Sequence, residues 1–373
     1  MTLDTFIRLV VPDLGPEELR EVEEVFASGQ LTQGPKVAAF ERVVADRVAA
    51  AHGIATTSAT TALHLSLAAL GIGPRDEVLV ADYTFPASAN VVVQQGARPV
   101  LVDIDPSTFT IDPKDLATKV THKTRAIMPV HTFGLSADMD PIMAIAEKHG
   151  LLVVEDAACA IGTTYYGRPV GSIGTLGCFS FHPRKAITTG EGGMVTTNDP
   201  AIADTLRLLR NHGGHRADGR FTFAMAGFNY RLSDILAAIG LAQMRKLEAV
   251  IAEKRRLAGA YRSALAGVPG VTPPVEPAWG GHVYQSFVIL LDSTIERDLV
   301  IARMRERGIE TTLGTYALHH EPFFRNTYGG QSGDLPGSWT AYRQSLTLPL
   351  YPGLGDNGVG RVVESLRAVL TWA

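Results

Sequence analysis

Lys185 and Asp156 are the residues whose types and spacing could carry covalent chemistry. Asp156 lies near the end of an apolar run, 151–157, and Lys185 follows a second run, 177–182, after a short turn. A lysine in a partly desolvated pocket is nucleophilic because burial disfavours its charged form. A carboxylate at the carboxyl end of a buried strand lies where open α/β sheets bind ligands. Pyridoxal 5'-phosphate (PLP) requires this pair, a lysine for a Schiff base and a carboxylate for its protonated ring nitrogen.

The segments that must position these residues alternate between short apolar runs and helical stretches. Runs rich in Val, Ile and Leu predict buried strands at 77–81, 98–104, 125–131 and 151–157. Two shorter strands are expected after them, at 177–182 and 192–197. Helical patterns occupy 61–71 and 139–150 between these strands. This alternation predicts an α/β fold with a mostly parallel sheet that is covered on both faces.

The pattern changes at Ser233, where a helical stretch of more than thirty residues begins. A helix of that length commonly bridges two lobes. A proline-rich connector follows it, and then a predicted strand at 282–292, a helix at 297–307 and a closing helix from Asn357. We therefore expect a large domain at 1–246 and a small α/β domain at 247–373.

Composition excludes several classes of function. The 34 Lys and Arg residues against 38 Asp and Glu residues give a net charge of −4, which offers no electrostatic footprint for nucleic acid or an anionic membrane. Two cysteines, Cys159 and Cys178, suit a reducing compartment. Because we find neither a membrane-length apolar run nor a signal-peptide layout, we expect a soluble, cytoplasmic protein.

Several long blocks occur in the order that is typical of one family. They include SGQLTQGPKVAAFE (28–41), EDAACAIG (155–162), FSFHPRKAITTGEGG (179–193), GFNYRLSDILAAIGLAQ (227–243) and YALHHEP (316–322). On these blocks the sequence resembles the DegT/StrS family of PLP-dependent aminotransferases over nearly the whole chain. The resemblance implies the aspartate-aminotransferase fold, which has a large lobe with a seven-stranded, mostly parallel sheet and a small C-terminal α/β lobe.

The resemblance also implies roles for individual residues. Lys185 would bind PLP covalently and then move the proton, and Asp156 would keep the ring nitrogen protonated. Phe85 would lie against the cofactor ring. The cofactor phosphate would be held by Ala59, Thr60 and Ser180, and by Asn229 from the partner subunit of a homodimer. A helix start at Ala59 favours an anion in any case.

Two positions depart from the family pattern. Cys159 stands where the family commonly has a Gln near the phenolic oxygen of the cofactor, and a thiol is a weak donor. Ala59 stands where a Gly is usual, so a positive φ at this residue would be strained. Lys185 itself distinguishes the chain from the branch of this fold that has His there and carries out dehydration.

Simpler interpretations remain open for some residues. Asp156 could be a helix N-cap, Phe85 could be a core residue, and Asn229 could be a turn residue. His212 and His215 have no further ligands nearby and are expected in a mobile loop rather than a metal site, and we expect no metal. The GxxGxxG pattern from Gly171 lacks the spacing of a dinucleotide-binding loop.

The predicted reaction is ping-pong transamination, in which PLP and pyridoxamine 5'-phosphate alternate. The resemblance implies L-glutamate or L-glutamine as the donor and a 3- or 4-keto deoxysugar on a nucleoside diphosphate as the acceptor, with Tyr316, His319 and Arg231 as candidate substrate contacts. A cyclitol ketone is the alternative acceptor. A PLP-binding regulatory protein without turnover is the alternative from a different class.

Overall fold

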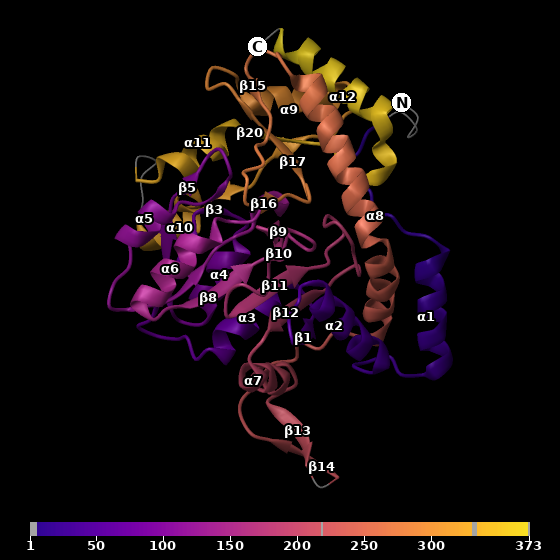
Figure 1. Ribbon diagram of the computed structural model, residues 1–373, viewed down its shortest axis with the longest axis vertical. Coiled ribbons are helices and arrows are strands. Elements are labelled where there is room, and N and C mark those ends of the chain that lie inside the picture. The colour runs from indigo at the N-terminus through magenta and orange to yellow at the C-terminus, as the bar shows by residue number, and fades with distance from the viewer. Residues whose placement is uncertain (1–5, 218, 330–333, 372–373) are drawn as a thin grey trace.

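A seven-stranded sheet lies at the centre of the computed structural model, which describes residues 6–217, 219–329 and 334–371 (Figure 1). Its strands follow in the order β1 (His52–Thr56), β12 (Gly193–Thr197), β11 (Leu176–Ser180), β8 (Leu152–Asp156), β7 (Thr124–Met128), β2 (Glu77–Ala81) and β4 (Arg98–Val102). Every neighbouring pair from β11 to β4 is parallel, whereas β12 is antiparallel to both β11 and β1. The predicted α/β fold with a mostly parallel, seven-stranded sheet is confirmed.

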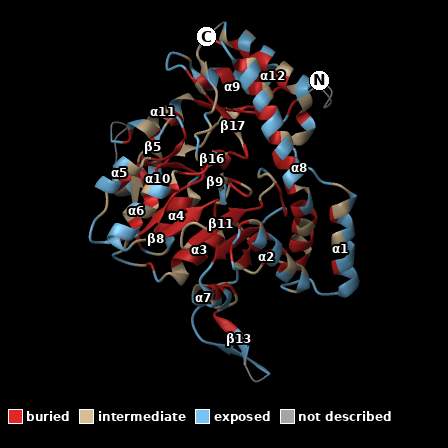
Figure 2. Ribbon diagram, in the orientation of Figure 1, coloured by how far each residue is buried: buried red, intermediate tan, exposed pale blue. Residues whose placement is uncertain are grey.

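Helices cover both faces of this sheet. Because successive strand residues point to opposite faces, their side chains contribute to two separate cores. Leu79, Ile127 and Val153 belong to one core together with α2 (Pro35–Arg47), α6 (Met139–His149) and α8 (Asp234–Leu265). Their neighbours, among them Val78 and Val154, belong to a second core with α3 (Ala59–Ala69), α4 (Ala87–Gln94) and α7 (Pro200–Arg210). Figure 2 shows the buried strands enclosed between these helices.

The helix of more than thirty residues that the sequence predicts from Ser233 is present as α8, which packs beside the seven-stranded sheet and continues into a C-terminal lobe. The Ser233 hydroxyl caps it by accepting the Leu236 amide, and its 32 residues run into the lobe at the top of Figure 1. Gly240 lets it approach α2 closely, since a Cβ there would lie 2.6 Å from the ring of Phe40. The lobe holds an antiparallel sheet in the order β15 (Val271–Thr272), β17 (Phe287–Leu291), β20 (Ser345–Leu348) and β18 (Thr312–Leu313), with α9 (Arg297–Glu306) and α12 (Gly355–Leu370).

Two further contacts tie the lobe to the rest of the chain. Ile7 forms a bridge with Ile309, and β19 (Tyr316–Ala317) pairs with β3 (Tyr83–Thr84) of the large domain. The boundary at 246/247 falls inside α8 and stays a proposal. The other described elements are α1 (Pro16–Ser28), β5 (Ile104–Asp105), β6 (Thr110–Ile111), α5 (Pro113–Thr118), β9 (Thr164–Tyr165), β10 (Arg168–Pro169), β13 (Gly214–Ala217), β14 (Arg220–Phe223), β16 (Gly280–Gly281), α10 (Pro322–Tyr328), α11 (Pro336–Gln344) and the 3-10 helices η2 (Thr132–Gly134), η3 (Leu318–His320) and η4 (Pro352–Leu354).

Two local predictions were wrong. The strand expected at 282–292 is limited to β17, because Tyr284 has a φ of 49° and its ring stacks on that of His282. The segment with His212 and His215, expected to be a loop, instead leads into the hairpin of β13 and β14 that projects at the bottom of Figure 1. Among the helices of the described ranges, we find none with the length and apolar character that a membrane crossing needs.

Candidate active site

Three polar residues gather where parallel strands of the sheet end. Asp156 is the last residue of β8, Ser180 is the last residue of β11, and Asp82 directly follows β2. Because β8, β11 and β2 run in the same direction, their carboxyl ends share one edge of the sheet. This is the edge at which open α/β sheets bind ligands.

The Asp156 carboxylate is buried at this edge, with 5% of the residue exposed. It accepts a hydrogen bond from the Ser88 hydroxyl at 2.7 Å and another from the Ala158 amide at 3.1 Å. Residues 157–163 form turns rather than a helix, so the N-cap interpretation of Asp156 is wrong. Sequence reasoning missed Ser88, although a hydroxyl in the first turn of a helix at the strand-end edge could have indicated it.

Lys185 lies beside the turn that follows Asp156. Its own turn is closed by the Lys185 amide donating to the His182 carbonyl at 2.8 Å, while the Arg184 amide donates to the His182 ring. The Lys185 Nζ donates to Cys159 Sγ at 3.1 Å. Since Cys159 is three residues after Asp156, this contact brings the amine to the turn that starts at the carboxylate.

The start of α3 offers unused backbone donors beside the same edge. Ser58 caps the helix by accepting the Thr61 amide, and the amides of Ala59 and Thr60 donate no hydrogen bond within the described part of the chain. Gly193 allows this approach, because a Cβ there would lie 2.2 Å from the Ser58 carbonyl oxygen. Ala59 has no positive φ, so the strain expected from Ala in place of Gly is absent. Two free amides at a helix N-terminus favour an anion.

Aromatic and imidazole side chains from the C-terminal lobe lie along the strand β3. Phe85 is 64% exposed, which excludes the core-packing interpretation, and its ring lies 6.4 Å from that of Tyr316. His319 is buried and bonded to Asp82 through Nδ1, at 2.6 Å, and through its amide. With Nδ1–H donating to the Asp82 carboxylate, the buried Nε2 of His319 has no hydrogen-bond partner among the described residues. Asp82 follows a strand just as Asp156 ends one, and this signal could have found it.

Asn229 and Arg231 lie on the segment between the hairpin and α8. Asn229 is exposed and forms a bridge with Asn211, whose side chain accepts a hydrogen bond from the Arg231 guanidinium. Arg231 also bridges to Thr56, two residues before the cap of α3. In the described ranges no three His, Cys, Asp or Glu side chains are grouped so that they could hold a metal ion.

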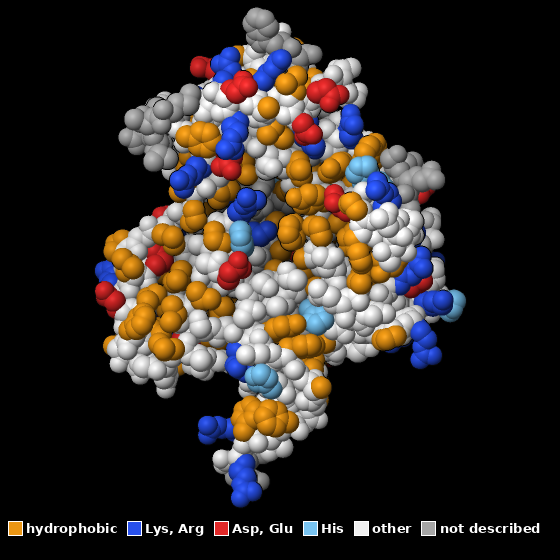
Figure 3. All heavy atoms as spheres, turned by 180° about the vertical axis from the view of Figure 1, so that it is seen from behind, with side chains coloured by type: hydrophobic (Ala, Val, Ile, Leu, Met, Phe, Trp, Pro, Cys, Tyr) orange, Lys and Arg blue, Asp and Glu red, His pale blue; other side chains and the backbone are white. Residues whose placement is uncertain are grey.

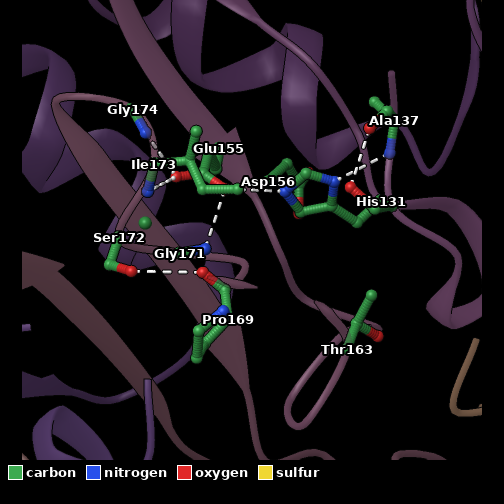
Figure 4. A network of polar contacts seen from close by, with 12 residues as sticks. His131, Ala137, Glu155, Asp156, Thr163, Pro169, Gly171, Ser172, Ile173 and Gly174 are labelled. Atoms are coloured by element: carbon green, nitrogen blue, oxygen red, sulfur yellow. Dashed lines mark hydrogen bonds and ion pairs between the residues drawn. The ribbon is translucent and has the colours of Figure 1, made fainter. Parts of the chain in front are cut away.

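A buried network supports β8 from its other side (Figure 4). The Glu155 carboxylate accepts hydrogen bonds from the amides of Gly171, Ile173 and Gly174 and from His131 Nε2 at 2.9 Å. The Ala137 amide donates to His131 Nδ1, so the ring proton is on Nε2. Burial alone would raise the pKa of Glu155, but these donors outweigh it and hold the pKa below 4.5. The glycine pattern from Gly171 therefore binds a carboxylate of the protein itself.

Replacing Glu155 with Gln is expected to lower the free energy of unfolding by about 2–3 kcal/mol, because buried amides lose a charged acceptor. A folded-state pKa below 4.5 means that the stabilisation is present above pH 4.5 and is lost as the pH falls through the folded value. The difference between parent and variant should therefore shrink in acid. Urea unfolding at pH 7 and pH 4 measures both effects, with exposed Glu147→Gln as the control. Equal stabilities at pH 7 would contradict this role of Glu155.

Comparisons with known proteins extend over nearly the whole chain. The model of the DegT/DnrJ/EryC1/StrS aminotransferase family matches residues 12–367. GDP-perosamine synthase of Caulobacter vibrioides is 43% identical over 340 residues, which are 90% of this chain and 91% of that protein. The structure of DesV from S. venezuelae is 35% identical and has a TM-score of 0.90, with coverage of 95% of this chain and 94% of DesV.

The putative sugar aminotransferase Spr1654 of Streptococcus pneumoniae has been solved in its PLP form and its PMP form. Each form is 29% identical to this chain with a TM-score of 0.94, and the PMP form is covered over 98% of both chains. DesV and Spr1654 have the same fold as this chain, that of fold type I aminotransferases. By the extent of the family match, the chain belongs to the DegT/DnrJ/EryC1/StrS aminotransferase family.

Proposed function

We propose that this aminotransferase uses PLP to move an amino group from L-glutamate or L-glutamine to a keto sugar carried on a nucleoside diphosphate. The observation that carries the proposal is the meeting of Lys185, the Asp156 turn and the free amides of α3 at one edge of the sheet. The sugar class follows from GDP-perosamine synthase and Spr1654, whose names describe sugar chemistry.

The residues present fit PLP. A carboxylate, a primary amine and two free helix amides match its ring nitrogen, its aldehyde and its phosphate. When bound, PLP supplies an electron sink for the carbon that loses its proton. Ala59, Thr60 and Ser180 hold the phosphate, and exposed Phe85 covers the ring.

Lys185 binds the cofactor covalently and afterwards moves a proton between carbon centres through its Nζ. The contact with Cys159 keeps the amine at the Asp156 turn. Asp156, fixed by Ser88 and the Ala158 amide, keeps a proton on the ring nitrogen through a charge-assisted hydrogen bond. Cys159, in the place of a stronger amide donor, accepts from Lys185.

A homodimer completes the site in this proposal, with Asn229 of each subunit serving the phosphate of the other. Asn229 is exposed and follows the projecting hairpin. The hairpin carries Phe221, 45% exposed, and Phe223, 64% exposed, and Figure 3 shows hydrophobic side chains gathered on it. Exposed aromatic side chains on a projecting element are typical of a surface covered by a partner.

Tyr316, His319 and Arg231 are the proposed substrate contacts. Tyr316 lies beside Phe85, and the buried Nε2 of His319, which has no partner in the described part of the chain, can accept a hydrogen bond from a sugar hydroxyl. Arg231 is on the segment beside the α3 start, where its guanidinium could meet a diphosphate. Free thiols at Cys159 and Cys178 support a reducing, cytoplasmic location.

A free nucleoside diphosphate is expected to inhibit the reaction competitively with the acceptor, because the nucleotide supplies much of the acceptor's binding energy. Initial rates with a keto sugar acceptor and a series of nucleoside diphosphates measure this, with inorganic pyrophosphate as the control. Inhibition by none of the nucleotides would contradict a nucleotide-sugar acceptor and favour a cyclitol ketone. A protein that binds PLP but converts neither acceptor would instead be the regulatory alternative.

A further inference from the structure

Lys254 is a buried lysine in the middle of α8 that the proposed chemistry does not use. Only 2% of the residue is exposed, and its Nζ donates to the backbone carbonyl of Gln285 at 2.9 Å. The ion pairs found among residues 6–217, 219–329 and 334–371 do not include it. Burying an ammonium without a carboxylate is unfavourable, and burial lowers the pKa of Lys254 to about 8. Such a position is a candidate for function rather than for stability.

Two routes lead from Lys254 to Lys185. The first runs through Gln285, whose backbone accepts the Lys254 bond and whose side-chain amide donates to the Arg184 carbonyl at 2.8 Å. Arg184 directly precedes Lys185, so Gln285 connects the buried lysine to the turn that carries the amine.

The second route is electrostatic and runs through Cys159. The interaction with Cys159 opposes the effect of burial on the pKa of Lys254, and the same sulfur accepts the hydrogen bond from Lys185. A cation near a cysteine sulfur makes the thiol more reactive, so we expect the charge of Lys254 to speed the reactions of Cys159. His282 is a further titratable side chain that interacts with Lys254. Burial lowers the pKa of His282 to about 3, so its ring is neutral.

We propose that Lys254 is a positioning residue for Lys185. Its ammonium holds Gln285 and thereby the 184–185 turn, and its charge acts on the Cys159 sulfur against which the Lys185 amine rests. The part that concerns catalysis rests on the proposed function, because it takes Lys185 as the residue that binds the cofactor. The part that concerns the thiol does not depend on PLP.

Alkylation of Cys159 in the cofactor-free protein tests the electrostatic route. The chain has two cysteines and Cys178 is fully buried, so iodoacetamide labelling followed by mass spectrometry reports Cys159. At pH 7.5, Lys254→Met is expected to slow labelling at least threefold, whereas Lys254→Arg, which keeps the charge, should stay within twofold of the parent. Exposed Lys148→Met is the control and should label at the parent rate.

If Lys254→Met does not fold, Lys254→Gln gives the same uncharged comparison and retains a donor toward the Gln285 carbonyl. Labelling of the folded uncharged variant at the parent rate, or faster, would overturn the proposal. In the PLP-loaded enzyme we expect kcat to fall about tenfold with the acceptor KM within twofold, and restoration by Lys254→Arg. An unchanged kcat would overturn the positioning role. A parent protein that takes up no PLP would contradict the proposed function. The labelling result would still show whether Lys254 acts on Cys159.

Discussion

Replacing Lys185 with Ala is expected to abolish amino transfer, with turnover reduced by at least about 10⁴-fold. The variant loses both the nucleophile and the group that moves the proton, and general acid–base catalysis alone contributes 10²- to 10⁴-fold. Lys185 is half-buried, and its amine bonds only to Cys159 in the described part of the chain. The fold should therefore persist, and PLP should bind without a covalent bond.

Three measurements check this prediction together. Turnover with L-glutamate should vanish, mass spectrometry after borohydride reduction should find no cofactor on the protein, and the melting temperature should stay within about 3 °C of the parent. The neighbouring Arg184→Ala is a suitable control because Arg184 is exposed. Retained turnover in the Lys185 variant, or cofactor reduced onto a different lysine, would be incompatible with the role assigned to Lys185.

Replacing Asp156 with Asn is expected to slow turnover about 10²- to 10³-fold while leaving PLP bound. Asn keeps the size of the side chain, and its oxygen can accept from the Ala158 amide while its NH2 group donates to the Ser88 hydroxyl. It loses the negative charge that keeps a proton on the ring nitrogen, and removing one such preorganised electrostatic contact costs about 3–4 kcal/mol of barrier.

The corresponding readout is the ratio of kcat between variant and parent, measured with saturating PLP. Asp140→Asn, an exposed change on α6, serves as the matched control. Ser88→Ala should give a smaller loss, because it frees one oxygen of the carboxylate without removing its charge. If Asp156→Asn turned over at the parent rate, the carboxylate would have no electronic role.

Much of the fold could be predicted from the sequence because the central strands are continuous apolar runs. The strand expected at 77–81 has the bounds of β2. The strands expected at 151–157 and 192–197 agree with β8 and β12 to within one residue at each end. Ends set by tertiary contacts were less predictable. The run 98–104 is interrupted after Val102 because the Asp103 carboxylate binds the amides of Gly337 and Ser338, far along the chain.

The site residues also fall into two groups, those that local sequence features reveal and those whose roles depend on tertiary contacts. Asp156 and Lys185 could be found because strand ends and the motif around them are local features. Local signals mark the positions of Ser88 and Asp82, but the roles of these residues depend on partners 68 and 237 residues away. Lys254 has no such local signal, and its partner lies 31 residues away. A lysine inside a helical pattern is usually a solvated residue, and only the packing of α8 reveals that Lys254 is buried.

The visible absorption spectrum of the purified, PLP-loaded protein before and after L-glutamate is added tests transamination by this protein most directly. We expect a visible band from PLP bound to Lys185, and its replacement by the near-ultraviolet band of pyridoxamine phosphate when the donor is supplied without an acceptor. L-Glutamine should be compared in the same way. A band that neither amino acid changes would contradict transamination with these donors, and the absence of any visible band would mean that Lys185 does not bind the cofactor.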